Sequence, residues 1–114
     1  MELLTSFYYT KNQKRQEELI TTLKKNLSKQ FIHKIHLYIT TNDYKKFNES
    51  DFINNNNYNK INILIRNHQP TYEELFRVAS KFDNKIICIC NSDIEFDINN
   101  IDILNKLDDS CYFL

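Results

Sequence analysis

Residues 85–97 of the chain read KIICICNSDIEFD, and they indicate its fold class. Ile86 to Cys90 is an almost unbroken apolar run, which is typical of strands that are covered on both faces of a parallel sheet. Directly after this run the chain becomes polar and acidic. Together the two parts predict a buried strand over residues 85–91 that leads into a ligand site, because open parallel sheets bind ligands beyond the carboxyl ends of their strands.

Short apolar or alternating runs earlier in the chain predict three more strands. They lie at residues 2–8, 34–40 and 60–66. The spacing of apolar residues by three and four predicts helices over residues 13–29 and 71–82, the second opened by a capping box of Thr71 and Glu74. Thr41, Asn42 and Asp43 are turn-forming residues and predict a turn after the second strand.

The alternation of strands and helices predicts an α/β fold, with a mainly parallel sheet between two helical layers. Residues 1–114 are expected to form a single domain. The first and fourth strands should be neighbours where the strand order reverses. Residues 98–104 predict a short helix, and Cys111 to Leu114 predict a last strand whose apolar edge would pair with a second copy of the chain.

The composition excludes several classes of function. The chain of 114 residues contains no glycine, so it has no Walker A loop, no GxGxxG dinucleotide turn and no GxSxG nucleophile elbow. Its 15 basic residues balance 15 acidic residues, which argues against nucleic acid or an anionic membrane as a partner. We expect a cytoplasmic protein, because the sequence shows neither an apolar run of about 18 residues nor a signal peptide.

The three cysteines are interpreted as buried thiols without a chemical role. Cys88, Cys90 and Cys111 are odd in number, whereas a disulfide framework in a secreted chain uses an even set. A zinc site would need four ligands at short spacing. Cysteine is also among the residue types that are most often buried.

Asp93 and Glu95 form the strongest candidate site. In an extended backbone, side chains two residues apart point to the same face. Two carboxylates at a ligand-binding strand end suit Mg²⁺ or Mn²⁺, whose remaining positions water and phosphate oxygens fill. The alternative is a solvated acidic turn in which Asp97 caps the following helix. The chemistry of the residues leaves both interpretations open.

Several short stretches follow one another in an informative order. They are Thr5-Ser6-Phe7-Tyr8, Arg15 with Glu17-Glu18, Ile35-His36-Leu37-Tyr38, Ile63-Leu64-Ile65-Arg66 before Pro70-Thr71-Tyr72, and Ile89-Cys90-Asn91-Ser92-Asp93-Ile94-Glu95-Phe96-Asp97. The last stretch is the most specific. This order resembles the N-terminal half of nucleotide-sugar glycosyltransferases with the GT-A fold, especially the small forms found in large DNA viruses and some bacteria.

The resemblance implies which residues contact the nucleotide. In that family the end of the first strand receives the base. Ser6, Phe7 and Tyr8 would therefore lie near the base and the ribose. Arg15 and Arg66 would line the nucleotide side of the site.

The resemblance also implies a metal site. Asp93-Ile94-Glu95 corresponds to the family's DxD motif, in which a divalent metal bridges the diphosphate of the sugar nucleotide. A Mn²⁺ or Mg²⁺ ion would therefore be held at Asp93 and Glu95, and Asp93 would also lie at the ribose. A metal would neutralise the departing diphosphate in a chain without a glycine-rich loop. Glu95 replaces the more usual Asp and keeps its charge on a longer side chain.

The implied function is binding of a nucleoside-diphosphate sugar by a shortened GT-A-like domain in the cytoplasm, or in the host cytoplasm for a viral form. Because the resemblance covers only the N-terminal half of the family, we expect little or no sugar transfer by the isolated chain. The alternative is a non-catalytic α/β interaction module, in which the sheet is a scaffold and its C-terminal edge pairs with another chain. Dependence of nucleotide-sugar binding on a divalent metal distinguishes the two.

Overall fold

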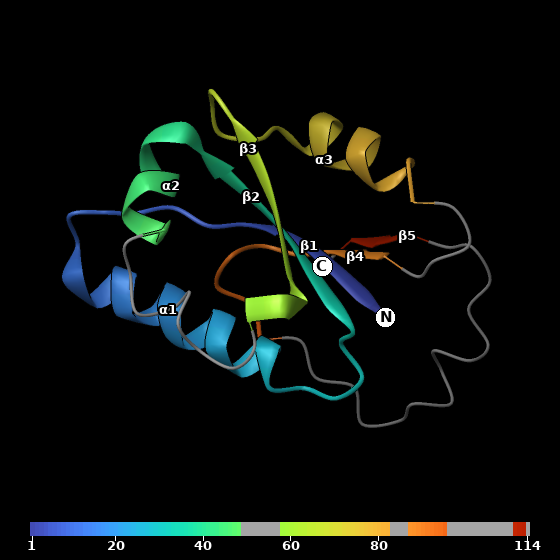
Figure 1. Cartoon of the computed structure of the whole chain (residues 1–114), viewed down its shortest axis with the longest axis horizontal. Helices are drawn as coiled ribbons and strands as arrows, with labels where there is room; N and C mark the ends of the chain where they lie inside the picture. The colour runs from blue at the N-terminus through green and yellow to red at the C-terminus, as the bar shows by residue number, and fades with distance from the viewer. Residues whose placement is uncertain (49–57, 83–86, 96–110, 114) are drawn as a thin grey trace.

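The computed structural model of the chain describes residues 1–48, 58–82, 87–95 and 111–113. Within these residues, five parallel strands form one sheet in the order β3-β2-β1-β4-β5 (Figure 1). The strands are β1 (Glu2–Ser6), β2 (Lys34–Thr40), β3 (Ile61–Arg66), β4 (Ile87–Ile89) and β5 (Cys111–Phe113). The helices are α1 (Gln13–Leu27), α2 (Thr41–Asn48) and α3 (Tyr72–Ala79), and a short 3-10 helix (Tyr58–Lys60) precedes β3.

Helices cover both faces of the sheet (Figure 1). On one face, Leu3 of β1 belongs to a core cluster with Leu19 of α1 and Phe47 of α2. On the other face, Leu4 packs in a second cluster with Leu75 of α3. Neighbouring residues of β1 thus enter different cores, as side chains of a strand that is covered on both sides must. The predicted α/β fold with a parallel sheet is confirmed.

The predicted elements appear close to their expected bounds. Residues 34–40 form β2 as predicted. The elements β1, β3, α1 and α3 are shorter than predicted by one to four residues, and β4 ends two residues before its predicted end. Helix α1 begins after Asn12, whose side chain accepts a hydrogen bond from the Arg15 amide at 3.1 Å. Helix α3 begins after Thr71, whose hydroxyl accepts from the Glu74 amide at 3.2 Å. The capping residue expected for the second helix is therefore present.

The prediction of a turn at residues 41–43 was wrong, because α2 begins there. The Asp43 amide donates to the Thr40 hydroxyl at 3.3 Å, so the hydroxyl satisfies a backbone amide in the first turn of the helix. Residues that favour turns also favour helix starts, since both uses satisfy exposed backbone amides. Burial of Phe47 against Phe7, with ring centroids 5.7 Å apart, makes the helical alternative favourable.

A buried polar row links the three strands on the α3 side of the sheet. His36 on β2 is 2% exposed and lies 2.5 Å from a carboxylate oxygen of Glu2 on β1. The side-chain amide of Asn62 on β3 donates to the other ring nitrogen of His36 at 2.9 Å. Both ring nitrogens of His36 therefore have polar partners.

Some predictions fall on residues outside the described part of the chain. These are the helix at residues 98–104, the cap at Asp97, the first two residues of the strand at 85–91, and Leu114. The described part of the predicted last strand, β5, pairs in parallel with β4 at the edge of the sheet.

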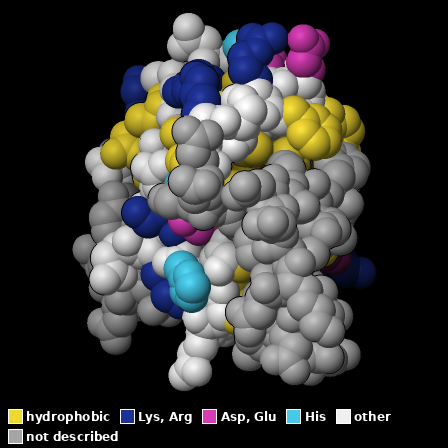
Figure 2. Space-filling view, turned by 90° about the vertical axis from the view of Figure 1, so that its right-hand side faces the viewer, with side chains coloured by type: hydrophobic (Ala, Val, Ile, Leu, Met, Phe, Trp, Pro, Cys, Tyr) yellow, Lys and Arg dark blue, Asp and Glu magenta, His cyan; other side chains and the backbone are white. Residues whose placement is uncertain are grey.

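The outer surface of the described residues mixes charged and apolar side chains. Figure 2 shows this at the top of the view, where α3 lies. The exposed large apolar residues of α3 are Tyr72 and Phe76. None of the described helices combines the length and the apolar character that a membrane crossing would need.

Candidate functional site

The strand order reverses between β1 and β4, and the candidate site lies at this point. The chain runs from β1 through β2 to β3 on one side, and returns through α3 to place β4 on the other side of β1. Leu4 pairs with Ile89, so the two strands end side by side. Beyond these ends the hydroxyls of Ser6 and Ser92 lie 2.9 Å apart. The prediction that the first and fourth strands are neighbours in the sheet is confirmed.

The segment after β4 is a turn and not an extended strand. The Ile94 amide donates to the Asn91 carbonyl at 3.2 Å, with Ser92 and Asp93 between them. The extended backbone assumed for the two carboxylates was therefore wrong, because Asn, Ser and Asp favour turns. The buried side chain of Asn26 on α1 donates to the Ile94 carbonyl at 3.1 Å and so fastens this turn to α1.

Arg15 contacts Asp93 directly. One terminal nitrogen of its guanidinium lies 3.1 Å from Asp93 Oδ2 and 3.5 Å from a carboxylate oxygen of Glu18. Its other two nitrogens both donate to the Tyr8 hydroxyl at 3.3 Å. The hydrogen bond to Tyr8 and, as a smaller effect, the hydrogen bond to Asp93 raise the already high pKa of Arg15. A permanent positive charge thus lies against Asp93.

Glu95 contacts a different cation. Its carboxylate lies 3.9 Å from Lys29 Nζ, just beyond the end of α1, whereas Arg15 is in the first turn. A helix of 15 residues is about 22 Å long. The structure therefore pairs the two carboxylates with cations at opposite ends of α1. Within the described ranges, no cluster of three or more His, Cys, Asp or Glu side chains is arranged to hold a metal ion.

The chemistry of Asp93 nevertheless suits a divalent cation. Mg²⁺ is usually bound by one or two carboxylates together with substrate phosphates and water. The Asp93 side chain is 42% exposed, so a cation has access to it. Asp93 alone could thus give one ligand to a metal that takes its other ligands from a substrate and from water.

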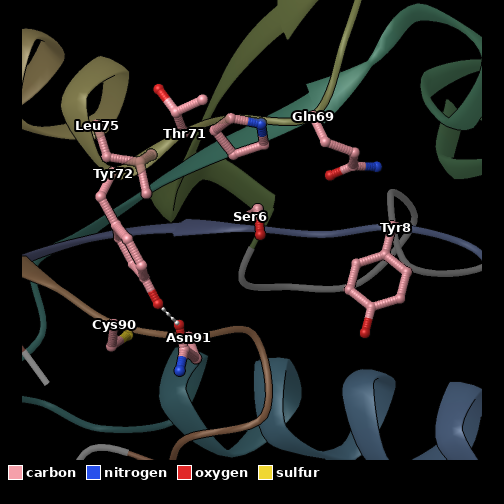
Figure 3. Close-up of a pocket in the computed structure, with 9 residues that line it drawn as sticks. Ser6, Tyr8, Gln69, Thr71, Tyr72, Leu75, Cys90 and Asn91 are labelled. Carbon is pink, nitrogen blue, oxygen red and sulfur yellow. Dashed lines mark hydrogen bonds between the residues drawn. The ribbon is translucent and has the colours of Figure 1, made fainter.

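A cavity of about 340 Å³ opens beside the two serines (Figure 3). It is lined by Ser6, Tyr8, Gln69, Pro70, Thr71, Tyr72, Leu75, Cys90 and Asn91. Tyr8 and Tyr72 stand on opposite sides of Ser6 in Figure 3, and the Tyr72 hydroxyl donates to Asn91 Oδ1 at 3.3 Å. Burial raises the pKa of Cys90 to about 11, so this thiol stays neutral and is no nucleophile near neutral pH.

Glu74 holds the loop that forms one wall of the cavity. Its carboxylate accepts hydrogen bonds from Tyr38 at 2.9 Å and from Thr71 at 3.3 Å, and it lies 2.9 Å from His68 Nε2. The hydrogen bonds from Tyr38 and His68 lower the pKa of Glu74. Burial, with the bond to Glu74, raises the pKa of Tyr38 to about 12. The loop between β3 and α3 is thereby tied to β2.

The structure brings only some of the predicted site residues together. Ser6 and Tyr8 line the cavity, and Arg15 reaches it by donating to the Tyr8 hydroxyl. Asp93 bonds to Arg15 but lines a separate hollow along α1. The side chain of Phe7 does not reach the cavity. It is 2% exposed and packs on the Tyr9 ring at 5.4 Å.

Arg66 also lies apart from the cavity. It is exposed at the end of β3, and β2 separates that strand from β1. Its guanidinium carbon is 5.9 Å from the centre of the Tyr38 ring. It is not among the lining residues.

Of the nine lining residues, only Ser6 and Tyr8 were predicted as site residues. Among the seven others, Gln69, Tyr72 and Asn91 present polar or aromatic groups that could contact a ligand. Asn91 follows β4, and the other two follow β3. Residues beyond the ends of parallel strands share one edge of the sheet, and this signal would have pointed to them.

We compared the chain with protein-family models, with curated proteins and with solved structures, and none of the three comparisons found a match. The geometry of the site and the resemblance of the quoted stretches therefore carry the functional interpretation.

Proposed function

We propose that the protein binds a nucleoside-diphosphate sugar at the edge of the sheet between β1 and β4, with a Mn²⁺ or Mg²⁺ ion at Asp93. The observation that carries this proposal is the meeting of Ser6 and Ser92, 2.9 Å apart, beside a cavity of about 340 Å³. A doubly wound sheet binds nucleotides at such a reversal of strand order. The resemblance to the GT-A family points to the same ligand.

The nucleoside would occupy the cavity. Tyr8 and Tyr72 offer aromatic surface, and stacking on a base is tolerant of base identity. The side-chain amides of Gln69 and Asn91 supply donors and acceptors for the base edge. The hydroxyl of Ser6 can exchange its bond with Ser92 for a bond to the ribose. The walls thus combine an apolar surface with a few polar groups, as small-molecule sites commonly do.

The diphosphate would lie beyond Tyr8, toward Arg15 and Asp93. The Tyr8 ring lines the cavity while its hydroxyl accepts from Arg15, so this side chain joins the two parts of the site. A bound metal would supply positive charge to the diphosphate as it departs. Asp93 would hold that metal, and Arg15 adds a fixed positive charge.

The ion pairs also support the second candidate, a non-catalytic interaction module. Arg15 balances Asp93 and Lys29 balances Glu95, so both carboxylates already have cationic partners. In a module of this kind the acidic turn would serve only to hold α1 against β4. Such a protein would need neither a metal nor a nucleotide.

Calorimetric titration with UDP-glucose, GDP-mannose, ADP-glucose and dTDP-glucose, each with and without Mn²⁺, tests the proposal. We expect at least one to bind, and to bind more tightly with Mn²⁺. Asp93→Asn should remove the metal-dependent part of the affinity with little loss of stability, because exposed ion pairs contribute only about 0–1 kcal/mol.

The matched control is Glu73→Gln. Glu73 is also an exposed carboxylate paired with an arginine, Arg77, at 3.2 Å, but it does not line the cavity. This variant should bind as the wild type does. Absence of binding to every nucleotide sugar, or unchanged metal dependence in Asp93→Asn, would contradict the proposal and favour the interaction module.

A further inference from the structure

Asn26 is a buried polar residue on a face of α1 that is otherwise apolar. It is 3% exposed, and the other buried residues of this helix are Leu19, Leu23 and Leu27. Asparagine has a low helix propensity, and a buried side-chain amide is unfavourable unless it forms a hydrogen bond. Its recorded acceptor is the Ile94 carbonyl, 68 residues further along the chain and 3.1 Å away. The amide thus serves a contact outside its own helix.

We propose that Asn26 is a positioning residue of the candidate site. Its hydrogen bond to Ile94 holds the turn after β4 in the conformation that forms one wall of the cavity, although Asn26 does not line the cavity itself. The inference rests on the proposed function for the identity of the ligand. Its claim about the turn concerns the protein without ligand.

The turn carries two of the contacts that build the site. The side chain of Asn91 lines the cavity and accepts from the Tyr72 hydroxyl at 3.3 Å (Figure 3). The hydroxyl of Ser92 lies 2.9 Å from that of Ser6. The Ile94 amide closes the turn by donating to the Asn91 carbonyl at 3.2 Å. A shift of Ile94 would therefore displace both contacts.

Two further contacts join the same parts of the chain, and both are ion pairs at least partly exposed to solvent. Arg15 lies 3.1 Å from Asp93, and Lys29 lies 3.9 Å from Glu95. Exposed ion pairs contribute little to stability, and salt screens them. A hydrogen bond from a buried amide is protected from water and depends on direction. The bond of Asn26 should therefore determine where the turn lies.

A wall that is fixed before binding favours the ligand. Asn, Ser and Asp can adopt several turn conformations, so the segment has little rigidity of its own. Without the bond from Asn26, the ligand would have to order the turn, and this loss of conformational freedom would reduce the affinity. We expect a decrease of about tenfold.

Asn26→Leu tests the claim about the turn. Leucine has a similar size and suits the apolar face, but it leaves the buried Ile94 carbonyl without its donor, so the turn should open toward water. Amide hydrogen exchange followed by nuclear magnetic resonance should show about tenfold faster exchange at Ile94. The Cys90 amide is the internal control, because it bonds to the Leu4 carbonyl at 3.1 Å within the sheet and should exchange as in the wild type.

A second variant separates loss of the donor from changes in packing. Asn26→Ala removes the same donor with a smaller side chain, and it should have the same effect on the Ile94 amide. Urea denaturation of both variants measures their global stability. A purely structural role would lower that stability and speed exchange at Cys90 as well as at Ile94.

The nucleotide-sugar affinity of the same proteins tests the claim about the site. Asn26→Leu should raise the Kd about tenfold. The matched control is Lys29→Met, which removes an exposed contact between the same helix end and the same segment. It should leave both the Ile94 exchange rate and the Kd within about twofold of the wild type.

The possible outcomes are distinct. Unchanged exchange at Ile94 in both Asn26 variants would overturn the inference, as would faster exchange with an unchanged Kd. Faster exchange at Ile94 alone, together with failure of every nucleotide sugar to bind the wild type, would refute the proposed function but support the role of Asn26 in positioning the turn.

Discussion

Tyr72 joins two parts of the site that lie far apart in the chain. It is the first residue of α3, and its hydroxyl donates to the side chain of Asn91, beyond β4, at 3.3 Å. The Tyr72 side chain is also 52% exposed, which is high for an aromatic residue that lines a cavity. An aromatic ring that is partly exposed beside a cavity is well suited to cover a flat ligand.

We therefore expect Tyr72→Ala to weaken nucleotide-sugar binding. Base–aromatic stacking contributes about 1–3 kcal/mol, which corresponds to roughly a 5- to 150-fold increase in Kd. Phe76→Ala is the control, because Phe76 lies one turn further along α3, is 45% exposed and does not line the cavity. Calorimetric titration of both variants measures the difference. Equal affinities would mean that Tyr72 does not contact the base.

The start of α3 depends on the sheet as well as on its own cap. Thr71 caps the helix, and Glu74 in the first turn accepts a hydrogen bond from Tyr38 on β2 at 2.9 Å. The carboxylate also lies beside His68, so it fixes the loop that carries Gln69 into the cavity wall. Glu74, which the local sequence predicts as part of the capping box, thus also ties the start of α3 to β2.

The contacts of the Glu74 carboxylate should make the free energy of unfolding depend on pH. The pKa of Glu74 is below its ordinary value of 4.5, so its ionised form favours the folded state. The contribution is present above pH 4.5 and is lost as the pH falls through the lowered pKa. Wild type should therefore be more stable than Glu74→Gln at pH 7, and this difference should shrink below pH 4.5.

Urea denaturation of both proteins at several pH values measures the effect. Glu73→Gln is the control, because the Glu73 side chain is 83% exposed and its pair with Arg77 lies on the helix surface. A difference between wild type and Glu74→Gln that stays constant from pH 7 to pH 3 would show that the carboxylate does not anchor the loop through its charge.

The sheet as a whole has two edges, β3 and β5. Their outer backbone groups have no strand neighbour within the described residues, and such edges can pair with another chain. The edge predicted for self-association is the C-terminal one, Cys111–Phe113. Pairing there would extend the sheet across two copies.

We expect a dimer that forms with increasing concentration through β5. Sedimentation velocity over a range of concentrations measures the association. Hydrogen exchange at low and high concentration then locates it, since amides that enter a new ladder become protected. Protection should increase in β5 and stay unchanged in β3. A monomer at all concentrations, or protection gained in β3 instead, would contradict this prediction.

Local patterns were sufficient to predict most of the elements. Residues 34–40 alternate along a strand, and the spacing of Leu19, Leu23 and Leu27 directs one face of α1 into the core. These signals are local, because the period of apolar residues reflects which side of an element is buried. The helix at residues 41–48 escaped prediction because a turn and a helix start use the same residues, and the contact of Phe47 with Phe7 favours the helix.

The site was predictable only in part. The meeting of the ends of β1 and β4 followed from the parallel order, which places Ser6 near the segment around Asp93. The partners of the charged side chains could not be predicted from the strand order, because Arg15 and Asp93 are 78 residues apart in the sequence. The fold brings such distant groups within hydrogen-bonding distance by packing α1 beside β4. Local sequence specifies the periodicity of each element, whereas the pairing of distant charges depends on how the whole chain packs.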